Sequence, residues 1–551
     1  MVAWAVGAHP LGVHPLGNAL LGDTINARPS GLGNMRILSD ALLLHFMAEY
    51  LDGPSVVALG ASSRMLYALA SVPHVWRDLY ARDFGEEVET WAGSWRGTYV
   101  AAALAQRSSH ATDNTYSQRV HAASQMRVRA RGVFSDDIYH AFLTAEFNPR
   151  AFLERAAHIE TRRWQRVHKV ATDTPPDRSD LLDNFTRVDA RSTNANEFVE
   201  HYAKTSTPCI LVRATDDWPC IVWTLDYVGQ TWATRKFQAE AIHISGAAYV
   251  DYARSPGGGG ILQAGNGAHL AVVPDTSPFY LFDARVASDT PEAKAGWRVP
   301  HQVAHYPHGA QDDNDARTRA DLFSLFGDAR PDFRWLIAGP ARSGSGWHKD
   351  PNMTSAWNAV MQGEKYWMML PPTTTPPGVY VSADQSEVTA PASISEWMLD
   401  FYAETKRLHG RREFGGDGQL IEGVCRAGEV MYVPSGWWHL VVNLDESVAL
   451  TQNFVSVVEL PAVLDFMKHT PDQISGFLKG SAKASLFDTF CAKLRAYDSA
   501  LADAALARLA EREERRAAPK GDWRERLCVD SPSSWTLAGV ANTEDLGEIP
   551  W

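Results

Sequence analysis

Apolar residues near the N-terminus follow a helical period. They recur at three- and four-residue intervals, which predicts a helix with one apolar stripe made of Leu43, Phe46, Met47, Tyr50 and Leu51. Ser39 or Asp40 is placed to cap this helix, and Gly53-Pro54 is placed to end it and start the next one. Short helices are expected to follow as far as Tyr80. The chain is therefore predicted to contain a small helical bundle in this region.

From Phe198 onward, the pattern changes to short apolar runs rich in β-branched and aromatic residues. The clearest candidate strands are residues 209–212, 279–282, 334–337, 366–370 and 428–434. Many short strands separated by turn signals favour a β-sandwich or barrel. The glycine run 257–260 and the acidic run 312–315 are expected to be solvent-exposed loops, the glycine run as a flexible connector. No Lys-Ser or Lys-Thr pair follows these glycines, so a phosphate-binding loop is not expected.

A helical period returns after Val455. Its apolar stripe comprises Leu494, Tyr497, Leu501, Ala505 and Leu509. This stripe suits a homodimer interface and suits packing on the protein's own β-domain equally well. Arginine and glutamate interleave over residues 508–516, which indicates a solvated helix end or a dimer surface. A further helix is expected over residues 150–162, between the N-terminal bundle and the β-rich region.

The composition is typical of an intracellular globular protein. Of its 551 residues, 45% are hydrophobic and 21% are charged, which is ordinary for a chain with a large buried core. The net charge of −13 argues against a protein that binds nucleic acid with its whole surface and leaves a local basic patch open. The five cysteines form no C-x-x-C pair and are expected to be reduced, mostly buried thiols in the nucleus or cytoplasm. No run of about 18 apolar residues is present, so no membrane span is expected.

Two histidines and an aspartate stand in a pattern typical of a metal site. His348 and Asp350 are two residues apart, and residues two apart in a strand point to the same face. His439 follows the apolar strand 428–434, a Ser-Gly turn and a tryptophan pair that is placed to exclude water. Two imidazoles and one carboxylate are the ligand set of mononuclear non-haem Fe(II) oxygenases, which leaves three coordination positions for chemistry. The sequence therefore predicts an iron site at these three residues.

Other candidate chemistry is weaker. His301, His305 and His308 form a loose cluster, but no carboxylate or cysteine stands at ligand spacing beside them, so a second metal is not expected. No nucleophile or acid–base pair is expected beyond the three metal ligands.

Residues 36–84 combine a leucine-rich first helix, a second helix of small residues, and the ending Val72-Pro73-His74-Val75-Trp76-Arg77-Asp78-Leu79-Tyr80. This segment resembles an F-box. The resemblance implies that the segment docks the Skp1 adaptor of a ubiquitin ligase. The alternative is a small helical bundle that packs on the catalytic domain.

A longer series of motifs covers residues 187–456, about half of the chain. The series comprises Thr207-Pro208-Cys209-Ile210-Leu211, Asp217-Trp218-Pro219 with Trp223, Ser277-Pro278-Phe279-Tyr280-Leu281-Phe282-Asp283, Phe333-Arg334-Trp335-Leu336-Ile337-Ala338-Gly339-Pro340, Ser355-Ala356-Trp357-Asn358-Ala359-Val360, Gly436-Trp437-Trp438-His439, Asn443-Leu444-Asp445 and Thr451-Gln452-Asn453-Phe454. These motifs resemble the Jumonji-C family of Fe(II)- and 2-oxoglutarate-dependent oxygenases. Within it, the subgroup that contains the bifunctional arginine demethylase and lysyl-hydroxylase is the most similar.

The resemblance assigns roles to six further residues. Lys365 matches the cation that binds the distal carboxylate of 2-oxoglutarate, and Ser345 and Tyr280 match hydroxyls that join the same carboxylate. Relatives carry threonine where Ser345 stands, so slightly weaker packing with retained binding is expected. Asn358, Thr451 and Asn453 match positions near the metal-proximal end of the co-substrate.

The resemblance also implies the reaction class. The expected cofactors are Fe(II), 2-oxoglutarate and dioxygen, and the expected reaction is hydroxylation of a protein side chain, foremost a lysyl side chain, coupled to formation of succinate. Two alternatives stay open. One is demethylation of N-methyl arginine or lysine in a histone or another protein, and the other is an F-box substrate adaptor that uses the β-domain as a binding module.

The predicted organisation is a multidomain α+β protein. Its core is a double-stranded β-helix of the cupin-like jelly-roll type, preceded by the F-box-like bundle and followed by helices. The predicted boundaries are a flexible leader 1–34, the F-box-like domain 35–110, a connecting helical segment 111–186, the Jumonji-C domain 187–456, C-terminal helices 457–518 and an irregular tail 519–551.

Overall fold

The computed structural model describes most of the predicted domains. It covers residues 28–107, 147–168, 181–260, 275–289, 291–304, 320–477 and 483–517, with isolated positions 118, 120, 133, 135, 137, 138 and 144. The predicted tail 519–551, the acidic run 312–315, His305, His308 and residues 1–27 of the predicted leader lie outside the described residues. Residues 28–34, which were expected to belong to a flexible leader, form helix α1 (Arg28–Leu32) and the start of a 3₁₀ helix.

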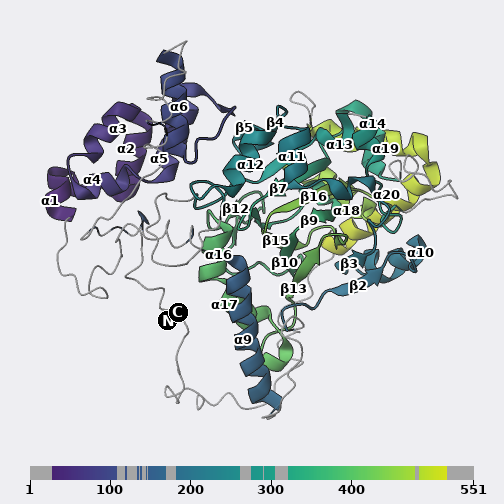
Figure 1. The fold of residues 1–551 in the computed structure, drawn as a ribbon. Helices are drawn as coiled ribbons and strands as arrows, with labels where there is room; N and C mark the ends of the chain where they lie inside the picture. The colour runs from purple at the N-terminus through teal and green to yellow at the C-terminus, as the bar shows by residue number, and fades with distance from the viewer. Residues whose placement is uncertain are drawn as a thin grey trace.

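Two β-sheets form the core of the protein (Figure 1). The larger sheet has ten strands in the order β1-β5-β4-β6-β7-β16-β9-β14-β3-β2, and the smaller has the order β13-β10-β15-β8. The outer strands of the larger sheet are β1 (Glu87–Val88), β5 (Ile242–Ser245), β4 (Lys236–Ala239), β6 (Leu281–Asp283) and β2 (Thr186–Asp189). The central strands of the larger sheet are β7 (Arg334–Gly339), β16 (Ser447–Phe454), β9 (Ser355–Gln362), β14 (Val430–Val433) and β3 (Cys209–Val212). The smaller sheet comprises β13 (Ile421–Arg426), β10 (Glu364–Leu370), β15 (Trp438–Asn443) and β8 (Gly344–His348). The predicted jelly-roll core is confirmed. Four predicted strands coincide with β3, β7, β10 and β14, whereas only the second half of 279–282 is a strand, as the start of β6.

Side-chain alternation places a separate apolar layer on each face of the smaller sheet. Odd-numbered residues of β10, such as Trp367 and Met369, pack between the two sheets with Ile210 and Val360 of the larger sheet. Even-numbered residues of β10 pack outward, under helices α9 (Pro149–His168), α16 (Ile394–Asp400) and α17 (Tyr402–His409). Because β10 is buried on both faces, its sequence is a nearly continuous apolar run.

The predicted N-terminal bundle is present as helices. These are α2 (Asp40–Tyr50), α3 (Gly53–Gly60), α4 (Arg64–Leu69), α5 (Pro73–Phe84) and α6 (Trp95–Arg107). Ser39 caps α2, because its side chain accepts a hydrogen bond from the backbone of Leu42. The predicted stripe on α2 is divided: Leu43 and Met47 face the bundle core, whereas Phe46 and Tyr50 are exposed.

The bundle is joined to the β-domain by backbone pairing and by buried side chains. Strand β1 (Glu87–Val88) pairs in parallel with β5 (Ile242–Ser245) at the edge of the larger sheet. The indole Nε1 of Trp95 donates a hydrogen bond to the buried carboxylate of Asp275 at 3.0 Å, and that of Trp91 donates to Ser255 Oγ at 2.7 Å. The bundle therefore packs on the β-domain and continues its sheet.

The glycine run differs from its prediction as an exposed, flexible connector. Gly257, Gly258 and Gly259 are buried, in a turn after α12 (Gly246–Arg254). The amide of Gly259 donates to Tyr252 O at 2.9 Å, and a Cβ at Gly259 would overlap the ring of Pro340. The glycines are needed because two backbone segments pass too close for side chains. Composition alone indicates a loop and does not reveal this close approach.

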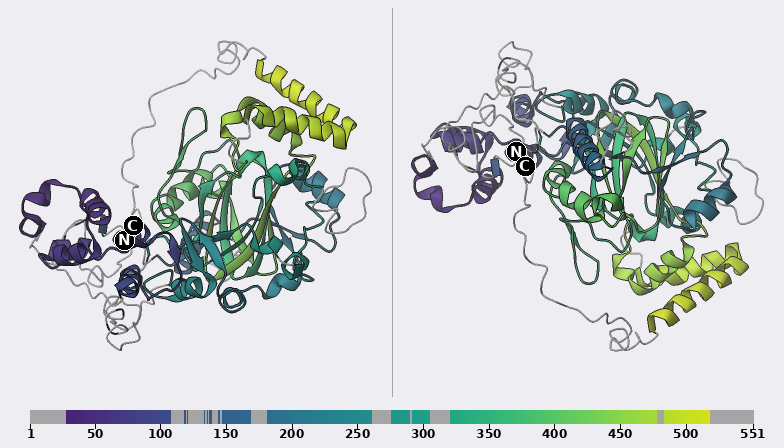
Figure 2. Two further views of the ribbon diagram at one scale, coloured as in Figure 1. Left: turned by 90° about the horizontal axis from the view of Figure 1, so that it is seen from above. Right: turned by 90° about the horizontal axis from the view of Figure 1, so that it is seen from below.

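The C-terminal helices cover one side of the barrel (Figure 2). They are α18 (Leu460–His469), α19 (Lys483–Tyr497) and α20 (Ser499–Ala517), so the predicted stripe is divided between two helices at Asp498. Leu494, Ala505 and Leu509 of this stripe are buried against α18 and the segment around Phe326 of the same chain. The stripe therefore packs within the chain, and a homodimer stays a prediction that needs another surface.

Arginine and glutamate at the end of α20 bind neighbouring charges. Arg516 pairs with Asp465 of α18 at 2.7 Å, and Glu513 lies 2.7 Å from both Lys468 and His469.

Among the described ranges, the chain contains no helix that is both long and apolar enough to cross a membrane. Four of the five cysteines lie in these ranges, and all four are buried free thiols.

Candidate active site

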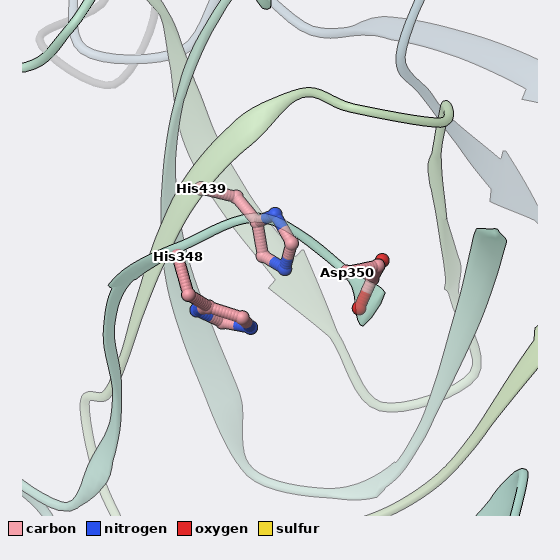
Figure 3. A group of neighbouring side chains, drawn as sticks. All are labelled: His348, Asp350 and His439. Carbon is pink, nitrogen blue, oxygen red and sulfur yellow. The ribbon is translucent and has the colours of Figure 1, made fainter. Parts of the chain in front are cut away.

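The three predicted metal ligands converge at one end of the smaller sheet (Figure 3). His348 ends β8 and stands directly opposite His439 of β15, with ring centroids 4.1 Å apart. Asp350 lies two residues beyond the strand in extended conformation, just before the short 3₁₀ helix η7 (Pro351–Met353). The potential ligand atoms of the three residues lie within 4.8 Å of one another. No other group of three metal-binding side chains occurs among the residues that the structure describes.

A β-bulge determines which residues of β8 face the site. His439 pairs with His348, but Val441 pairs with Ser345, so three steps along β8 match two steps along β15. Residues three apart in a regular strand point to opposite faces. The extra residue lets Ser345 and His348 share the interior face. The position predicted for a co-substrate hydroxyl is therefore on the same side as the metal ligands.

Backbone carbonyls fix the tautomers of both histidines. Nδ1 of His348 lies 2.7 Å from Gly346 O, and Nδ1 of His439 lies 3.1 Å from Trp437 O. A carbonyl only accepts hydrogen bonds, so Nδ1 carries the proton in each ring. Each Nε2 then has a lone pair for a metal, which is the usual arrangement of metal-binding histidines.

The aspartate has an oxygen without a partner. Oδ2 of Asp350 is buried and makes no hydrogen bond. Burial raises the pKa of Asp350, although His348 and a hydrogen bond with Asn453 lower it. Burial also holds the pKa of His439 well below its ordinary value. A buried carboxylate oxygen beside the Nε2 atoms of two imidazoles fits a divalent metal ion, because a cation satisfies all three groups.

Lys365 lies deeper between the sheets and has neutral partners. It is fully buried on β10, opposite Cys425 of β13 and Asn443 of β15. Its Nζ donates to Tyr280 Oη at 2.6 Å and to Asn443 Oδ1 at 2.7 Å. Burial lowers the pKa of Lys365 to about 7. A buried amine hydrogen-bonded to neutral groups fits an anionic ligand, such as the distal carboxylate of a dicarboxylate.

The remaining predicted residues lie on the facing sheet. Asn358 pairs with Thr451 in register, and both are buried. Asn358 Oδ1 has no partner, which leaves an acceptor for a ligand. Thr451 Oγ1 donates instead to Trp357 O at 3.0 Å, and Asn453 Nδ2 donates to Thr354 Oγ1 at 2.9 Å. Asn453 thus lies beside Asp350, whereas the Thr451 hydroxyl proton is used within the sheet.

Two residues of the site were not predicted. Asn443 binds Lys365 directly, and Trp367 lies beside His439, with rings stacked 6.1 Å apart and a buried Nε1 that has no partner. The alternation of side chains along each strand could have indicated both. Trp367 is two residues from Lys365 on β10 and Asn443 is four residues from His439 on β15, so each shares the face of a predicted site residue. His301, from the weaker cluster, instead lies near Thr193 O at 3.3 Å and Gln302.

This barrel and its ligands define a class of protein. A jelly roll that holds two histidines and a carboxylate at one end, with a buried lysine deeper inside, is the arrangement of a mononuclear iron oxygenase that uses a 2-oxo acid. A family model described as a cupin-like domain matches residues 195–459.

Known relatives agree with this class. The chain is 33% identical to the arginine-specific demethylase JMJ22 of Arabidopsis thaliana, over 81% of this chain and 72% of that protein. It is 28% identical to the lysine-specific demethylase JMJ21 of the same plant, over 78% of this chain and 38% of that protein. It is 29% identical to the bifunctional arginine demethylase and lysyl-hydroxylase psr-1 of Caenorhabditis briggsae, over 57% of this chain and 74% of that protein. The chain belongs to the Jumonji-C family of cupin-like oxygenases that depend on Fe(II) and 2-oxoglutarate.

Proposed function

We propose that this oxygenase hydroxylates a side chain of a protein substrate, foremost a lysyl side chain. One observation supports the site assignment: the His-Asp-His group and Lys365 open onto the same interior. His439 and Asn443 lie four residues apart on one face of β15, and Asn443 binds Lys365. Four residues of strand span roughly 13 Å, so the metal ligands and Lys365 stand at different depths of the same interior.

In this proposal, His348, Asp350 and His439 hold Fe(II), and Lys365 and Tyr280 bind the distal carboxylate of 2-oxoglutarate. Bound iron and co-substrate supply the oxidising chemistry, in which 2-oxoglutarate, dioxygen and a substrate C–H group give succinate, carbon dioxide and a C–OH group. The protein fixes the ligands, orients the co-substrate and excludes water.

Succinate formation tests this assignment. Purified protein with Fe(II), ascorbate and a lysine-containing peptide pool is expected to convert 2-oxoglutarate to succinate and to add one oxygen to a peptide, as measured by mass spectrometry. Asp350→Ala is the matched inactive control. Succinate formation by Asp350→Ala at a rate similar to wild type would contradict the metal assignment, and turnover without any oxidised peptide would contradict lysyl hydroxylation.

Demethylation of N-methyl arginine or lysine is the second candidate. It is supported by the names of the plant relatives, which describe an arginine-specific and a lysine-specific demethylase. The same hydroxylation placed on an N-methyl group gives an unstable hemiaminal that releases formaldehyde. Methylated arginine and lysine peptides distinguish the two: demethylation removes a methyl group and yields formaldehyde, whereas lysyl hydroxylation retains the added oxygen.

An adaptor role through Skp1 is supported by a different surface. Three apolar residues at four-residue spacing are exposed along α2: Leu42, Phe46 and Tyr50. They lie on the face of α2 that the bundle core does not use. Adaptor and oxygenase roles are compatible, because α2 belongs to the bundle, which lies beside the barrel (Figure 1).

Pull-down with purified Skp1 tests the adaptor role. The doubly changed Phe46→Asp, Tyr50→Asp protein is expected to lose binding while its thermal stability changes little, since both side chains are exposed. Val167→Asp alters an equally exposed apolar residue on α9 and serves as control. Absence of binding by the wild type would refute the adaptor role.

Location in the nucleus or cytoplasm stays a prediction, consistent with the buried free thiols.

A further inference from the structure

Asn443, which was not predicted as a site residue, connects Lys365 to the turn 340–343. It is fully buried at the end of β15. Its Oδ1 accepts from Lys365 Nζ at 2.7 Å, and its Nδ2 donates to Ser343 Oγ at 2.9 Å. The backbone repeats the connection, because Asn443 N donates to Ser343 O at 2.8 Å and Arg342 N donates to Asn443 O at 3.0 Å. The turn 340–343 and the end of β15 are therefore one rigid unit.

The chemistry of Ser343 determines which way the Asn443 amide points. Ser343 Oγ donates its single proton to Pro340 O at 2.6 Å. Towards Asn443 the hydroxyl then presents only lone pairs, so it accepts from Nδ2 and cannot donate to Oδ1. A flipped amide would place Oδ1 against these lone pairs and the NH₂ group against the Lys365 amine. Ser343 thus keeps the amide oxygen directed at Lys365.

The amide orients the amine without neutralising it. A charged lysine has three N–H groups, and two of them are used by Tyr280 and Asn443. Because both acceptors are neutral, the positive charge is left for an incoming anion. A carboxylate in place of the amide would occupy the same position but would form a permanent internal ion pair, which competes with a ligand carboxylate.

We propose that Ser343 and Asn443 are positioning residues for the co-substrate, which hold the Lys365 amine in place and keep it available for the distal carboxylate of 2-oxoglutarate. This inference rests on the proposed binding role of Lys365. It assigns to Ser343, which does not touch the co-substrate, an effect on its affinity.

The test measures 2-oxoglutarate binding by calorimetry to protein loaded with Mn(II). Asn443→Asp is expected to raise Kd at least roughly 30-fold, because its carboxylate competes with the ligand for the amine. Ser343→Ala is expected to raise Kd roughly tenfold, because a flipped amide loses its charge-assisted contact with Lys365. Ser343→Thr, which keeps the hydroxyl, is expected to stay within about threefold of wild type. The affinity for Mn(II) alone should not change, because neither residue is a metal ligand. In turnover, KM for 2-oxoglutarate should rise while kcat at saturation stays within about twofold.

Gln452→Glu is the matched control. Gln452 is also a buried amide that accepts from a buried cation, Arg334 at 2.7 Å, but it lies on the outer face of the larger sheet. The same amide-to-carboxylate change there should leave the Kd of 2-oxoglutarate within about twofold of wild type.

The outcomes separate this inference from the proposed function. Failure of wild-type protein to bind 2-oxoglutarate refutes the co-substrate pocket itself. Tight binding by wild type together with unchanged Kd in Ser343→Ala and Asn443→Asp overturns the positioning role. Equal weakening of Mn(II) and 2-oxoglutarate also overturns it, since this indicates a general structural effect. Where Asn443→Asp does not fold, as judged by thermal unfolding, Ser343→Ala and Ser343→Thr decide the question.

Discussion

Binding of 2-oxoglutarate is expected to weaken as the pH rises from about 6 to about 8, because an anion needs the charged form of Lys365. Burial lowers the pKa of this residue to about 7. Burial raises the pKa values of Tyr280 and Cys425, so both are neutral, and Asp445 is paired with Arg150 at 2.6 Å. The ammonium of Lys365 is therefore the titrating group of this pocket.

The size and sign of the effect follow from this pKa. Roughly nine tenths of the Lys365 side chains are protonated at about pH 6 and roughly one tenth at about pH 8. A bound carboxylate raises the pKa of the amine, so the ligand takes up a proton when the amine is neutral beforehand. The apparent Kd should be roughly tenfold higher at about pH 8 than at about pH 6. Proton uptake should be near 0.1 per ligand at the lower pH and about 0.9 at the higher.

Calorimetry measures both quantities. Titrations of Mn(II)-loaded protein in buffers with different ionisation enthalpies give Kd and the number of protons taken up. Metal occupancy is checked at each pH, so that titration of the metal ligands is not mistaken for that of Lys365. A Kd that is constant between about pH 6 and about pH 8, with no proton uptake, would show that Lys365 is charged throughout and would refute the reasoning.

Three other predictions concern the metal site and the packing. His348→Ala should abolish both Mn(II) binding and succinate formation, and retained turnover would contradict its role as a ligand. Gly259→Ala should lower the free energy of unfolding by about 1–3 kcal/mol in denaturant titration, because its Cβ would overlap Pro340; an unchanged midpoint would mean that the turn moves freely. Leu450→Ala removes a fully buried side chain on β16 and should cost about 2–5 kcal/mol by the same measurement, whereas a cost below about 1 kcal/mol would indicate that the core relaxes into the space.

Residues in contiguous motifs were the most predictable from sequence. His348 and Asp350 are two positions apart, and their convergence needs only an extended backbone. His439 and Lys365 were placed by motifs on separate strands, and the structure brings these strands side by side as β15 and β10. Local spacing and family motifs were sufficient here because each motif carries its own strand.

Features that depend on register between distant strands were not predictable in the same way. The bulge that turns Ser345 inward exists only in the pairing of β8 with β15. Asn443 became part of the site because it stands opposite Lys365 in that sheet. The glycine turn was misjudged for a related reason, since the nearness of Gly259 to Pro340 is a contact between segments far apart in sequence.

The helical period near the N-terminus located an apolar face without identifying its partner. Leu43 and Met47 belong to the periodic pattern and are buried in the bundle core. Phe46 and Tyr50 belong to the same pattern but lie on an exposed face. Periodicity reports that side chains lie on one side of a helix, and burial depends on which elements pack there. Exposed residues in such a pattern are informative because the fold of the single chain does not account for them.

The connection between bundle and barrel bears on whether adaptor and oxygenase can act separately. Strand β1 lies between helices α5 and α6 of the bundle and pairs with β5. Strand β5 pairs with β4 (Lys236–Ala239), and β4 in turn meets β6 (Leu281–Asp283). Tyr280, the hydroxyl that binds Lys365, immediately precedes β6. The sheet that anchors the bundle is thus the sheet that positions part of the proposed co-substrate pocket. A partner docked on the exposed face of α2 is consequently held in a fixed relation to the active site, so a substrate recruited by such a partner would meet the barrel in a defined orientation.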